Sequence, residues 1–466
     1  MKHINKKLLW AALLLCAANS PVFADEFSLT TEALEGEHLT LALNAGVEAT
    51  LIWDGEESTS ENFIFNGDFQ EIPVKGKELK ITTQQPVTVL FCSNNKLVEL
   101  SVSTLKSLQT LVCNDNNISN ISLYSNGELR EISLQRNVLQ SLSLESNRKV
   151  ESLNLAQNPL KTLTVSSLPD LKTVNIAQTE LTQFNVTKSS NLEKLFAQES
   201  SLKSINASGP VETVCAYDSQ LETLNLSNTA AVKNFWASDN KLSTLDLGSA
   251  KKLADLVAER NNLREISLSS QTRSTLKNFF VSDNELMFNS FPTQTSSMTA
   301  ELTPQRNHML NQTVGVDESV VLDDLVLRNA WGEYLKPTYV WKLKSDDSVI
   351  PETDWKNTRN AEFSFSKPFG DVYCEVSMTK YPDIVLKVDG IHVGDATGIS
   401  SSEFDSACQI TGGENCIRIV CSSPCQIAVV RSDGKFVRSE KVQAGTYEWV
   451  MPKGIYIVNN KKVLVK

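Results

Sequence analysis

A phrase of 21 residues recurs between residues 87 and 284, and this period constrains the fold more than any other feature of the chain. The first three copies read VTVLFCSNNKLVELSVSTLKS, LQTLVCNDNNISNISLYSNGE and LREISLQRNVLQSLSLESNRK. Seven later copies begin at Val150, Leu171, Leu192, Val211, Val232, Leu253 and Leu276, and two of them depart from the period, with 19 and 23 residues. The consensus L-x-x-L-x-[C/A/L]-x-x-N-x-L-x-x-L-x-L is typical of a leucine-rich repeat, in which stacked copies share one continuous core.

Within each copy, positions 4 and 6 alternate along a short strand and are expected to point inward, as Leu111 and Cys113 do. The second L-x-x-L-x-L stretch predicts an extended return on the other face, because so short a period leaves little room for full helices. The ninth position holds Asn95, Asn116, Asn137, Asn158, Asn240, Asn261 and Asn284. An amide there can donate to and accept from the backbones of adjacent rungs. Thr179, Ser200 and Ser219 replace it in three copies, where we expect more irregular rungs.

The length of 466 residues indicates several domains. Residues 25–86 contain short alternating stretches and are predicted to form an N-terminal β cap, which includes Trp53, over the repeat domain of residues 87–299. Residues 300–395 are predicted to form an immunoglobulin-like β-sandwich with Trp341 and Cys374 in its core. Residues 396–466 are a Ser-rich linker followed by a small β domain. The expected fold class is therefore mainly β.

The N-terminus predicts export. Lys2, Lys6 and Lys7 precede the apolar run of residues 8–18, and a small residue, Ala24, offers a cleavage point before Asp25, so residues 1–24 are predicted to be a signal peptide. The alternative is a lipoprotein signal at Cys16, for which Leu15 is too bulky. No other apolar run approaches the roughly 18–20 residues of a membrane-spanning helix. The net charge of −11 argues against nucleic acid or an anionic membrane surface as a partner.

The cysteines fall into two groups. Cys92 and Cys113 occupy the same inward position of adjacent copies and are interpreted as small buried hydrophobes, with a strained disulfide as the alternative. Cys215 lies one position off, on the outward side of its strand. Four further cysteines near the C-terminus of an exported chain are candidates for one or two disulfides: Cys408, Cys416, Cys421 and Cys425. Four cysteines allow three pairings.

The sequence contains no recognisable catalytic constellation. Its four histidines are scattered, and H-E-x-x-H, G-x-S-x-G, P-loop and paired C-x-x-C motifs are all absent. Many carboxylates are present, but nothing marks a particular pair for hydrolysis. We therefore expect no enzymatic activity, no cofactor and no metal. A Ca²⁺ ion near the acidic turn residues is conceivable, but no ion-binding loop motif supports it.

The outward positions of the repeats predict a binding surface. Positions 3, 5 and 7 are expected to face the open concave side, where aromatic residues gather in the C-terminal half and acidic residues at positions 7 and 8 lie beside them. This candidate ligand-binding patch comprises Phe196, Tyr217, Trp236, Phe280, Glu199, Asp218, Asp239, Glu259 and Asp283. Alternatively, another domain covers these rings, or a register shift by one residue turns them into core. The N-terminal half, with Ser133, Asn154 and Asn175, is polar and interpreted as plain solvated surface.

Two resemblances rest on these residues. The 21-residue copies, with Cys92 and Cys113 at position six and Asn at position nine, resemble the internalin J-like leucine-rich repeat surface proteins of bacteria, although cysteine fills that position in only two copies. Residues 451–466, MPKGIYIVNNKKVLVK, look like the C-terminal sorting domain of type IX secretion cargo in Bacteroidetes, although the usual Pro-Asn-Pro phrase is missing. The second resemblance implies the type IX secretion machinery as a partner and a location at the outer membrane or outside the cell. The alternative is an ordinary β tail that simply caps the protein.

The leading hypothesis from the sequence is an exported or surface-displayed, adhesin-like recognition protein that binds a protein ligand on its concave face. A glycan-binding module is the first alternative, because Trp and Tyr faces stack on sugar rings and carboxylates bind hydroxyls. A structural surface or biofilm component without a discrete site is the second.

Overall fold

The computed structural model describes residues 25–394 except 166, and residues 408–466 except 414, 422–424, 432–435, 459–460 and 466. The predicted signal peptide and linker therefore lie outside the described residues. The chain forms two compact units. Unit 1 comprises the chain up to His308 with Asp324–Pro337 and Met378–Leu386. Unit 2 comprises Met309–Asp323, Thr338–Ser377 and the chain from Lys387 onward. No helix among the described residues is long and apolar enough to cross a membrane.

The N-terminal segment of unit 1 is built from strands that alternate buried and exposed residues. Its five-stranded sheet has the order β4-β3-β6-β1-β8. These strands are β1 (Asp25–Thr31), β3 (Val47–Trp53), β4 (Glu61–Phe65), β6 (Glu78–Thr83) and β8 (Leu97–Ser101). Trp53 is buried in this segment, as expected. Two further strands, β2 (His38–Leu43) and β5 (Gln70–Pro73), extend the repeat sheet, with β2 antiparallel to the first repeat strand, β7.

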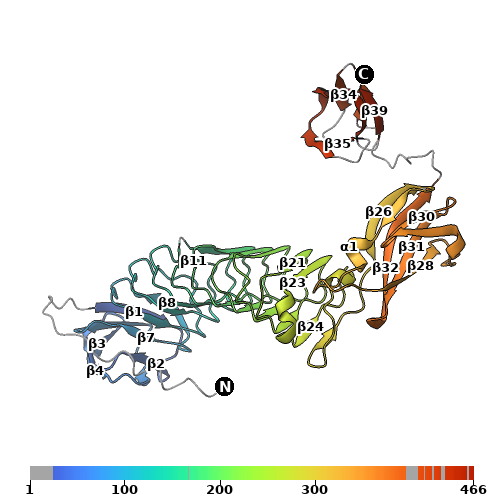
Figure 1. The fold of residues 1–466 in the computed structure, drawn as a ribbon. Helices are drawn as coiled ribbons and strands as arrows, with labels where there is room; N and C mark the ends of the chain where they lie inside the picture. Colours follow the sequence, from blue (N-terminus) through green and yellow to red (C-terminus); the bar gives the residue numbers. More distant parts are fainter. Residues whose placement is uncertain are drawn as a thin grey trace. The chain divides into compact units, whose positions relative to one another are not determined.

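The repeats form a leucine-rich repeat solenoid, as predicted, with one short parallel strand per copy (Figure 1). These strands are β7 (Val89–Phe91), β9 (Thr110–Val112), β10 (Glu131–Ser133), β12 (Ser152–Asn154), β14 (Thr173–Asn175), β16 (Lys194–Phe196), β18 (Thr213–Cys215), β20 (Asn234–Trp236), β22 (Asp255–Val257) and β24 (Asn278–Phe280). An eleventh parallel strand, β25 (Thr299–Glu301), follows β24. With β2 and β5 they make a sheet of 13 strands. Positions 4 and 6 of every copy are buried, so the predicted register is correct.

The returning stretch of each copy is extended rather than helical, as expected from the short period. Its strands pair in three separate groups: β11-β13, β15-β17-β19 and β21-β23. They span β11 (Ser141–Ser143), β13 (Thr162–Thr164), β15 (Gln183–Val186), β17 (Ser204–Ala207), β19 (Thr223–Leu226), β21 (Thr244–Leu247) and β23 (Glu265–Leu268). We call this the convex face, and the 13-stranded sheet the concave face. Short 3-10 turns lie at η1 (Glu57–Thr59), η2 (Ser270–Ser274) and η3 (Phe288–Ser290).

The position-9 asparagines connect neighbouring rungs in the manner predicted. The Asn137 side chain donates to the carbonyl oxygens of Cys113 at 2.9 Å and Leu134 at 3.1 Å, and accepts from the N–H of Ile118 at 3.0 Å. Asn116, Asn158, Asn240, Asn261 and Asn284 repeat this pattern. Asn126 and Asn147 form a second ladder that the sequence reading missed. Each ladder satisfies buried backbone groups that no strand partner reaches.

The expected irregularity at Thr179, Ser200 and Ser219 does not extend to the strands. β14, β16 and β18 pair in register across these copies. Thr179 and Ser200 each donate to a carbonyl of their own rung, at 2.8 Å from Ile176 and Ala197. A hydroxyl can therefore satisfy the local carbonyl, and the Ser219 hydroxyl also reaches the preceding rung, where it lies 3.3 Å from the Ala197 carbonyl oxygen and 3.2 Å from the Ser200 N–H.

The C-terminal end of the solenoid packs against the two later segments of unit 1. Tyr381 contacts the rings of Phe288 and Phe291, with centroids 5.6 and 6.2 Å away. Trp331 is buried and its indole N–H donates to the Thr272 hydroxyl. The Glu333 carboxylate pairs with Arg273 at 2.9 Å and Lys380 at 2.7 Å. Residues far apart in the sequence thus close the last rungs.

Unit 2 contains a sandwich of two small sheets. The first has the order β26-β32-β31-β28, from β26 (His308–Gly315), β28 (Pro337–Leu343), β31 (Gly370–Met378) and β32 (Tyr381–Gly394). The second joins β27 (Ser319–Val321), β29 (Trp355–Arg359) and β30 (Glu362–Phe365). Trp341 packs against Phe363 and Phe365, and both Trp341 and Cys374 are fully buried, as predicted. The turns α1 (Asp323–Val326) and η4 (Glu352–Asp354) complete the described elements of this region.

The last part of the chain is a separate β module. Its two sheets have the orders β33-β34-β37 and β36-β35-β38-β39. The strands are β33 (Cys408–Gly412), β34 (Cys416–Cys421), β35 (Cys425–Arg431), β36 (Phe436–Val442), β37 (Gly445–Val450), β38 (Gly454–Val458) and β39 (Lys461–Val465). Ile417, Ile419, Ile427, Val429 and Trp449 are among its core residues.

Candidate functional site

The outward-facing side chains of the concave sheet form the candidate site. Position 5 is partly exposed in most copies, between the buried positions 4 and 6. Phe196, Trp236 and Phe280 are partly exposed there, and Tyr217, at position 7, has 37% of its surface accessible. The structure therefore places all four predicted aromatic residues on the open face of a sheet whose backbone is fixed in register.

Cys215 differs from its expected exposure. Its strand partners are Phe196 on one side and Trp236 on the other, so two large rings flank a small side chain. Only 7% of Cys215 is accessible, although it points to the concave side. Burial and the nearby Glu199 raise the pKa of the Cys215 thiol to about 11. We define Phe196, Tyr217 and Trp236 as the aromatic cluster; Phe280 lies two strands beyond Trp236, past Val257.

The predicted acidic residues lie at the turn that follows each strand. Glu199, Asp218, Asp239 and Asp283 occupy position 8, where every copy has a positive φ, from 49° to 59°. Such a backbone favours Asn and Asp among non-glycine residues, and five of the ten copies have asparagine or aspartate there. The turn holds successive position-8 side chains in a row along the edge of the concave sheet, one per rung.

Two of these carboxylates already have partners. Asp239 receives hydrogen bonds from Arg260, the position-8 residue of the next rung, at 2.6 and 2.8 Å, and these bonds lower the pKa of Asp239. Glu259 contacts the Ser282 hydroxyl at 3.0 Å and Arg260 at 3.8 Å. Arg260 was not among the site residues predicted from the sequence, and all of those at position 8 were acidic. An arginine one copy after an aspartate was the available signal.

Glu199 and Asp218 have a different environment. Both side chains are exposed, and neither takes part in an ion pair within the described residues. The Glu199 carboxylate accepts a hydrogen bond from Gln178 at 2.5 Å and lies 3.5 Å from the Tyr217 hydroxyl. Burial, followed by Cys215 and Glu199, raises the pKa of Tyr217, so its hydroxyl stays protonated at neutral pH. Two anionic groups thus lie beside an exposed ring.

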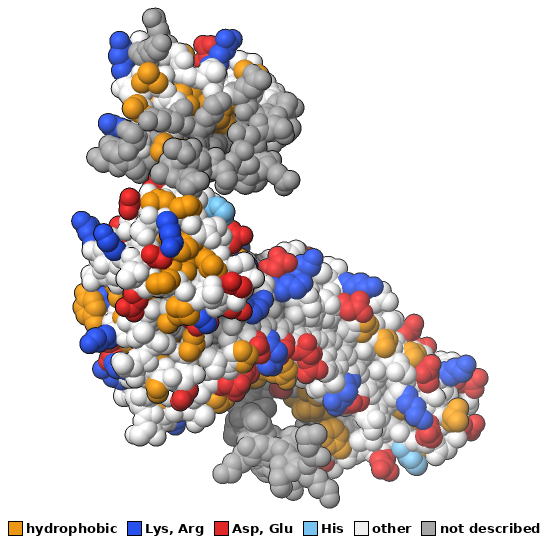
Figure 2. Space-filling view, turned by 90° about the vertical axis from the view of Figure 1, so that its right-hand side faces the viewer, with side chains coloured by type: hydrophobic (Ala, Val, Ile, Leu, Met, Phe, Trp, Pro, Cys, Tyr) orange, Lys and Arg blue, Asp and Glu red, His pale blue; other side chains and the backbone are white. Residues whose placement is uncertain are grey.

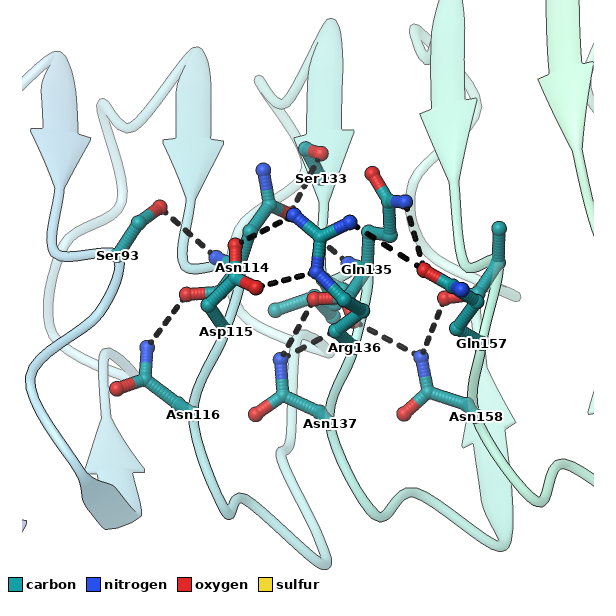
Figure 3. A network of polar contacts seen from close by, with 12 residues as sticks. Ser93, Asn114, Asp115, Asn116, Ser133, Gln135, Arg136, Asn137, Gln157 and Asn158 are labelled. Atoms are coloured by element: carbon teal, nitrogen blue, oxygen red, sulfur yellow. Dashed lines mark hydrogen bonds and ion pairs between the residues drawn. The ribbon is translucent and has the colours of Figure 1, made fainter. Parts of the chain in front are cut away.

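The N-terminal half of the concave face is a connected polar network rather than plain solvated surface (Figure 3). The Asn114 side chain accepts hydrogen bonds from the Ser133 hydroxyl and the Gln135 backbone, both at 2.8 Å. Arg136 forms a two-point ion pair with Asp115, one rung earlier, and also donates to Gln157, one rung later, at 3.3 Å. Polar groups in this half are therefore largely occupied by one another.

The C-terminal half of the concave face carries more carboxylates than cations. Positions 3, 5, 7 and 8 from β16 onward, with β25, carry two cations, Lys194 and Arg260. The same positions carry the carboxylates of Glu199, Asp218, Asp239, Asp255, Glu259, Asp283 and Glu301. Figure 2 shows acidic and basic side chains interspersed on one face of the molecule. Some of them pair across rungs, for example Glu151 with Arg130 and Lys172.

A cavity of about 490 Å³ lies on the opposite, convex face, between β19 and β21, which do not pair with each other. Leu224 and Leu226 line it and remain partly exposed, whereas Leu245 and Leu247 in the next copy are buried. Glu222 and Asp246 supply its charged groups. This cavity shares no residue with the aromatic cluster.

The three cysteines of the repeats form no disulfide in this structure. Cys92, Cys113 and Cys215 have free thiols, and burial raises the pKa of Cys92 well above its ordinary value. In the C-terminal module Cys416 has a free thiol and Cys421 is buried, while the side chains of Cys408 and Cys425 lie outside the described residues. The disulfides proposed for this module stay a prediction. Within the part of the chain that the structure describes, no three His, Cys, Asp or Glu side chains are grouped as metal ligands would be.

Comparison with known proteins finds similarity only among solved structures. No protein-family profile matches the chain, and no curated protein matches its sequence. The functional domain of InlJ from Listeria monocytogenes, described as including a cysteine ladder, is 15% identical, with 67% of this chain and 92% of that chain covered and a TM-score of 0.24. YopM from Yersinia enterocolitica is 18% identical, with 52% of this chain and 70% of that chain covered and a TM-score of 0.30.

Proposed function

We propose that this chain is an exported, surface-displayed recognition protein that binds a protein partner through the C-terminal half of its concave face. The observation that carries the proposal is the exposure of large aromatic side chains, Tyr217 and Trp236 above all, on a sheet whose strands pair in register. Aromatic residues on a rigid surface supply large contact areas at a low cost in side-chain entropy, and they dominate the binding energy of many protein interfaces.

Several features support a binding surface over a passive one. The patch comprises Phe196, Tyr217, Trp236 and Phe280 with Glu199, Asp218, Asp239, Glu259 and Asp283 around them, an apolar centre with a polar rim. In the N-terminal half of the same face the polar groups described above bind one another, for example Asn114 with Ser133 and Asp115 with Arg136. Binding would therefore be confined to the half with the aromatic cluster.

Features near both ends of the sequence support this proposed location. The basic and apolar N-terminus favours export, and the resemblance of residues 451–466 to type IX sorting domains favours attachment at, or release from, the outer membrane through that machinery. These residues supply β38 and β39 of the C-terminal module. An adhesin-like role at the cell surface is consistent with both.

The proposal is tested by panning a phage-displayed random peptide library against the full chain and two variants. The first is the double substitution Tyr217→Ala with Trp236→Ala. The second is Tyr124→Ala, which removes a ring that is 76% exposed beside the smaller convex-face depression. Peptides enriched on the wild type should bind Tyr124→Ala equally and lose the double variant. If no peptide distinguishes the wild type from the double variant, the concave-patch proposal fails. A glycan array probed in parallel, with binding lost only in the double variant, would instead support the glycan-binding alternative.

A further inference from the structure

We propose that the partner presents an arginine side chain to Glu199 and Asp218, where it completes the position-8 row of the concave edge beside Tyr217. This inference rests on the proposed function and names the chemistry that the surface recognises. Three observations carry it: an internal precedent for the contact, the lack of an internal arginine at this point of the row, and the ring next to it.

The protein makes this contact twice within its own fold. Arg136 binds Asp115 through two donors, and Arg260 binds Asp239 in the same way, at 2.6 and 2.8 Å. In both pairs the carboxylate and the guanidinium are position-8 residues of consecutive rungs. The planar guanidinium matches the two oxygens of a carboxylate, and this geometry selects arginine over lysine.

Between these two pairs, the row of position-8 side chains contains no arginine. In the rung after Glu199 stands Asp218 instead of an arginine, and in the rung after Asp218 stands Asp239, which is already bound to Arg260. Neither Glu199 nor Asp218 has an ion-pair partner within the described residues. Successive rungs are spaced by roughly 4.8 Å, so two exposed carboxylates at equivalent positions leave room for a guanidinium that approaches from the solvent.

Tyr217 makes this point different from an ordinary acidic surface. Its exposed ring precedes Asp218 in the same rung, and its hydroxyl contacts the Glu199 carboxylate. A guanidinium that binds the carboxylates would therefore also lie near an aromatic face, and cations are attracted to such faces. The excess of carboxylates over cations in this half of the sheet would attract a basic partner segment from solution.

The occupant to which these observations point is an arginine-bearing segment of a protein partner. A lysine-bearing segment would satisfy the charge but would lose the two-point contact. A sugar could donate hydroxyl hydrogen bonds to a carboxylate, but neutral hydroxyls would not balance the charge of two adjacent carboxylates.

The test uses peptides enriched on the wild type and lost on the Tyr217→Ala, Trp236→Ala variant, and it measures their affinity for single variants. Asp218→Asn and Glu199→Gln remove charge at constant shape. Both should fold, because Asn94 and Gln178 occupy the same position with φ values of 59° and 54°. Each should weaken binding by about tenfold or more. Glu222→Gln, an exposed carboxylate on the convex face, is the matched control and should leave the affinity unchanged.

A second variant, Asp218→Arg, sharpens the result. It places an arginine one rung after Glu199, just as Arg136 lies one rung after Asp115. The new guanidinium should therefore form an intramolecular ion pair with the Glu199 carboxylate. We expect a folded protein that no longer binds the peptides. In the peptides, replacing arginine by citrulline, which keeps the shape without the charge, should have the same effect as Asp218→Asn, and replacing it by lysine should have a smaller one.

The outcomes separate the two proposals. Enriched peptides that lack arginine, or that bind Asp218→Asn and Glu199→Gln as tightly as the wild type, would overturn the arginine inference and leave concave-face recognition intact. Loss of discrimination by the Tyr217→Ala, Trp236→Ala variant itself would overturn the proposed function.

Discussion

Trp331 donates its indole N–H to the hydroxyl of Thr272 at 3.1 Å, across 59 residues of sequence. Thr272 lies in η2, which precedes the last repeat strand β24 in the chain, and is fully buried. Arg273 lies over the same indole, with its guanidinium carbon 5.0 Å from the ring centroid. The segment Asp324–Pro337 therefore closes the end of the solenoid by burying one large side chain, in the way that a terminal capping element must in a repeat protein.

Replacing Trp331 by Ala should open this end of the solenoid. Large-to-small substitutions at buried aromatic positions cost about 3–5 kcal/mol. Hydrogen exchange should rise in η2 and β24 and stay unchanged in β9 and β10, because each rung contacts only its neighbours. Tyr334→Ala is the matched control, since Tyr334 is 71% exposed in the same segment. Equal protection of β24 in the wild type and Trp331→Ala would contradict the capping role.

The Glu333 carboxylate, which pairs with Arg273 and Lys380, should make the stability of this end of the solenoid depend on pH. Hydrogen bonds from Lys380, first, and then from Thr293 lower its pKa to about 2. A carboxyl group with a depressed pKa stabilises the folded form fully above its unfolded value, and this contribution is lost as the pH falls toward the folded value. The stability of the solenoid end should therefore decline between about pH 4.5 and pH 2.

Glu333→Gln removes this dependence. At neutral pH the substitution should cost about 1–3 kcal/mol, because it weakens charge-assisted hydrogen bonds. Below pH 2 the wild type and the variant should differ little. The measurement is protection of η2 against exchange as a function of pH. A pH dependence that persists in Glu333→Gln would show that another group is responsible.

The repeat period predicted the solenoid and the inward positions, because leucines at a fixed spacing are all buried when successive copies stack and share one core. It also predicted the role of the Asn137 amide, whose hydrogen-bonding groups need partners from its own copy and from the preceding one. The Trp331 contact could not be predicted in this way, since it belongs to no repeating pattern and depends on two segments distant in sequence. The ladder of Asn126 and Asn147 was missed because only two copies carry it.

The candidate site was predictable in part. The alternation of the strands placed Tyr217 and Trp236 on the open face. The burial of Cys215 was not expected, because it depends on the size of the two neighbours, Phe196 and Trp236, rather than on the position of the cysteine itself. Asp239 and Arg260 occupy position 8 of consecutive copies. Their pairing could be predicted only by comparing the acidic and basic residues at position 8 from one copy to the next.

Thiol reactivity should follow burial. Cys92, Cys113 and Cys374 are fully buried, and burial raises the pKa of the Cys374 thiol. A buried neutral thiol reacts slowly, because the thiolate is the nucleophile. Alkylation of the native protein should leave these three unlabelled until denaturant is added. Native labelling of Cys416, which is partly exposed, would show that this residue is not in a disulfide. Peptide mapping by mass spectrometry reads this out. Rapid native labelling of Cys92 or Cys113 would show that the rungs open locally.

The position-9 ladder offers a test in which the sequence pattern predicts an increase in stability. Thr179 bonds only to its own rung, through the carbonyl of Ile176. An asparagine there would have its carbonyl oxygen near the N–H of Leu160 and its amide near the carbonyl of Leu155, by analogy with Asn158, which accepts from Leu139 and donates to Leu134. Because the copies that begin at Val150 and Leu171 both keep the 21-residue period, the geometry should carry over.

Thr179→Asn should therefore raise the stability of the solenoid by about 1 kcal/mol, the net contribution of one or two additional buried hydrogen bonds. Thr182→Asn makes the same chemical change at an exposed position three residues later and should be neutral. The opposite effect is expected for Asn137→Ala, which should lower the free energy of unfolding by about 3 kcal/mol. It leaves the carbonyls of Cys113 and Leu134 and the N–H of Ile118 without their side-chain partner. Urea unfolding followed by circular dichroism ranks the three variants. A destabilised Thr179→Asn would mean that the threonine rung has a spacing of its own, which the in-register strands do not reveal.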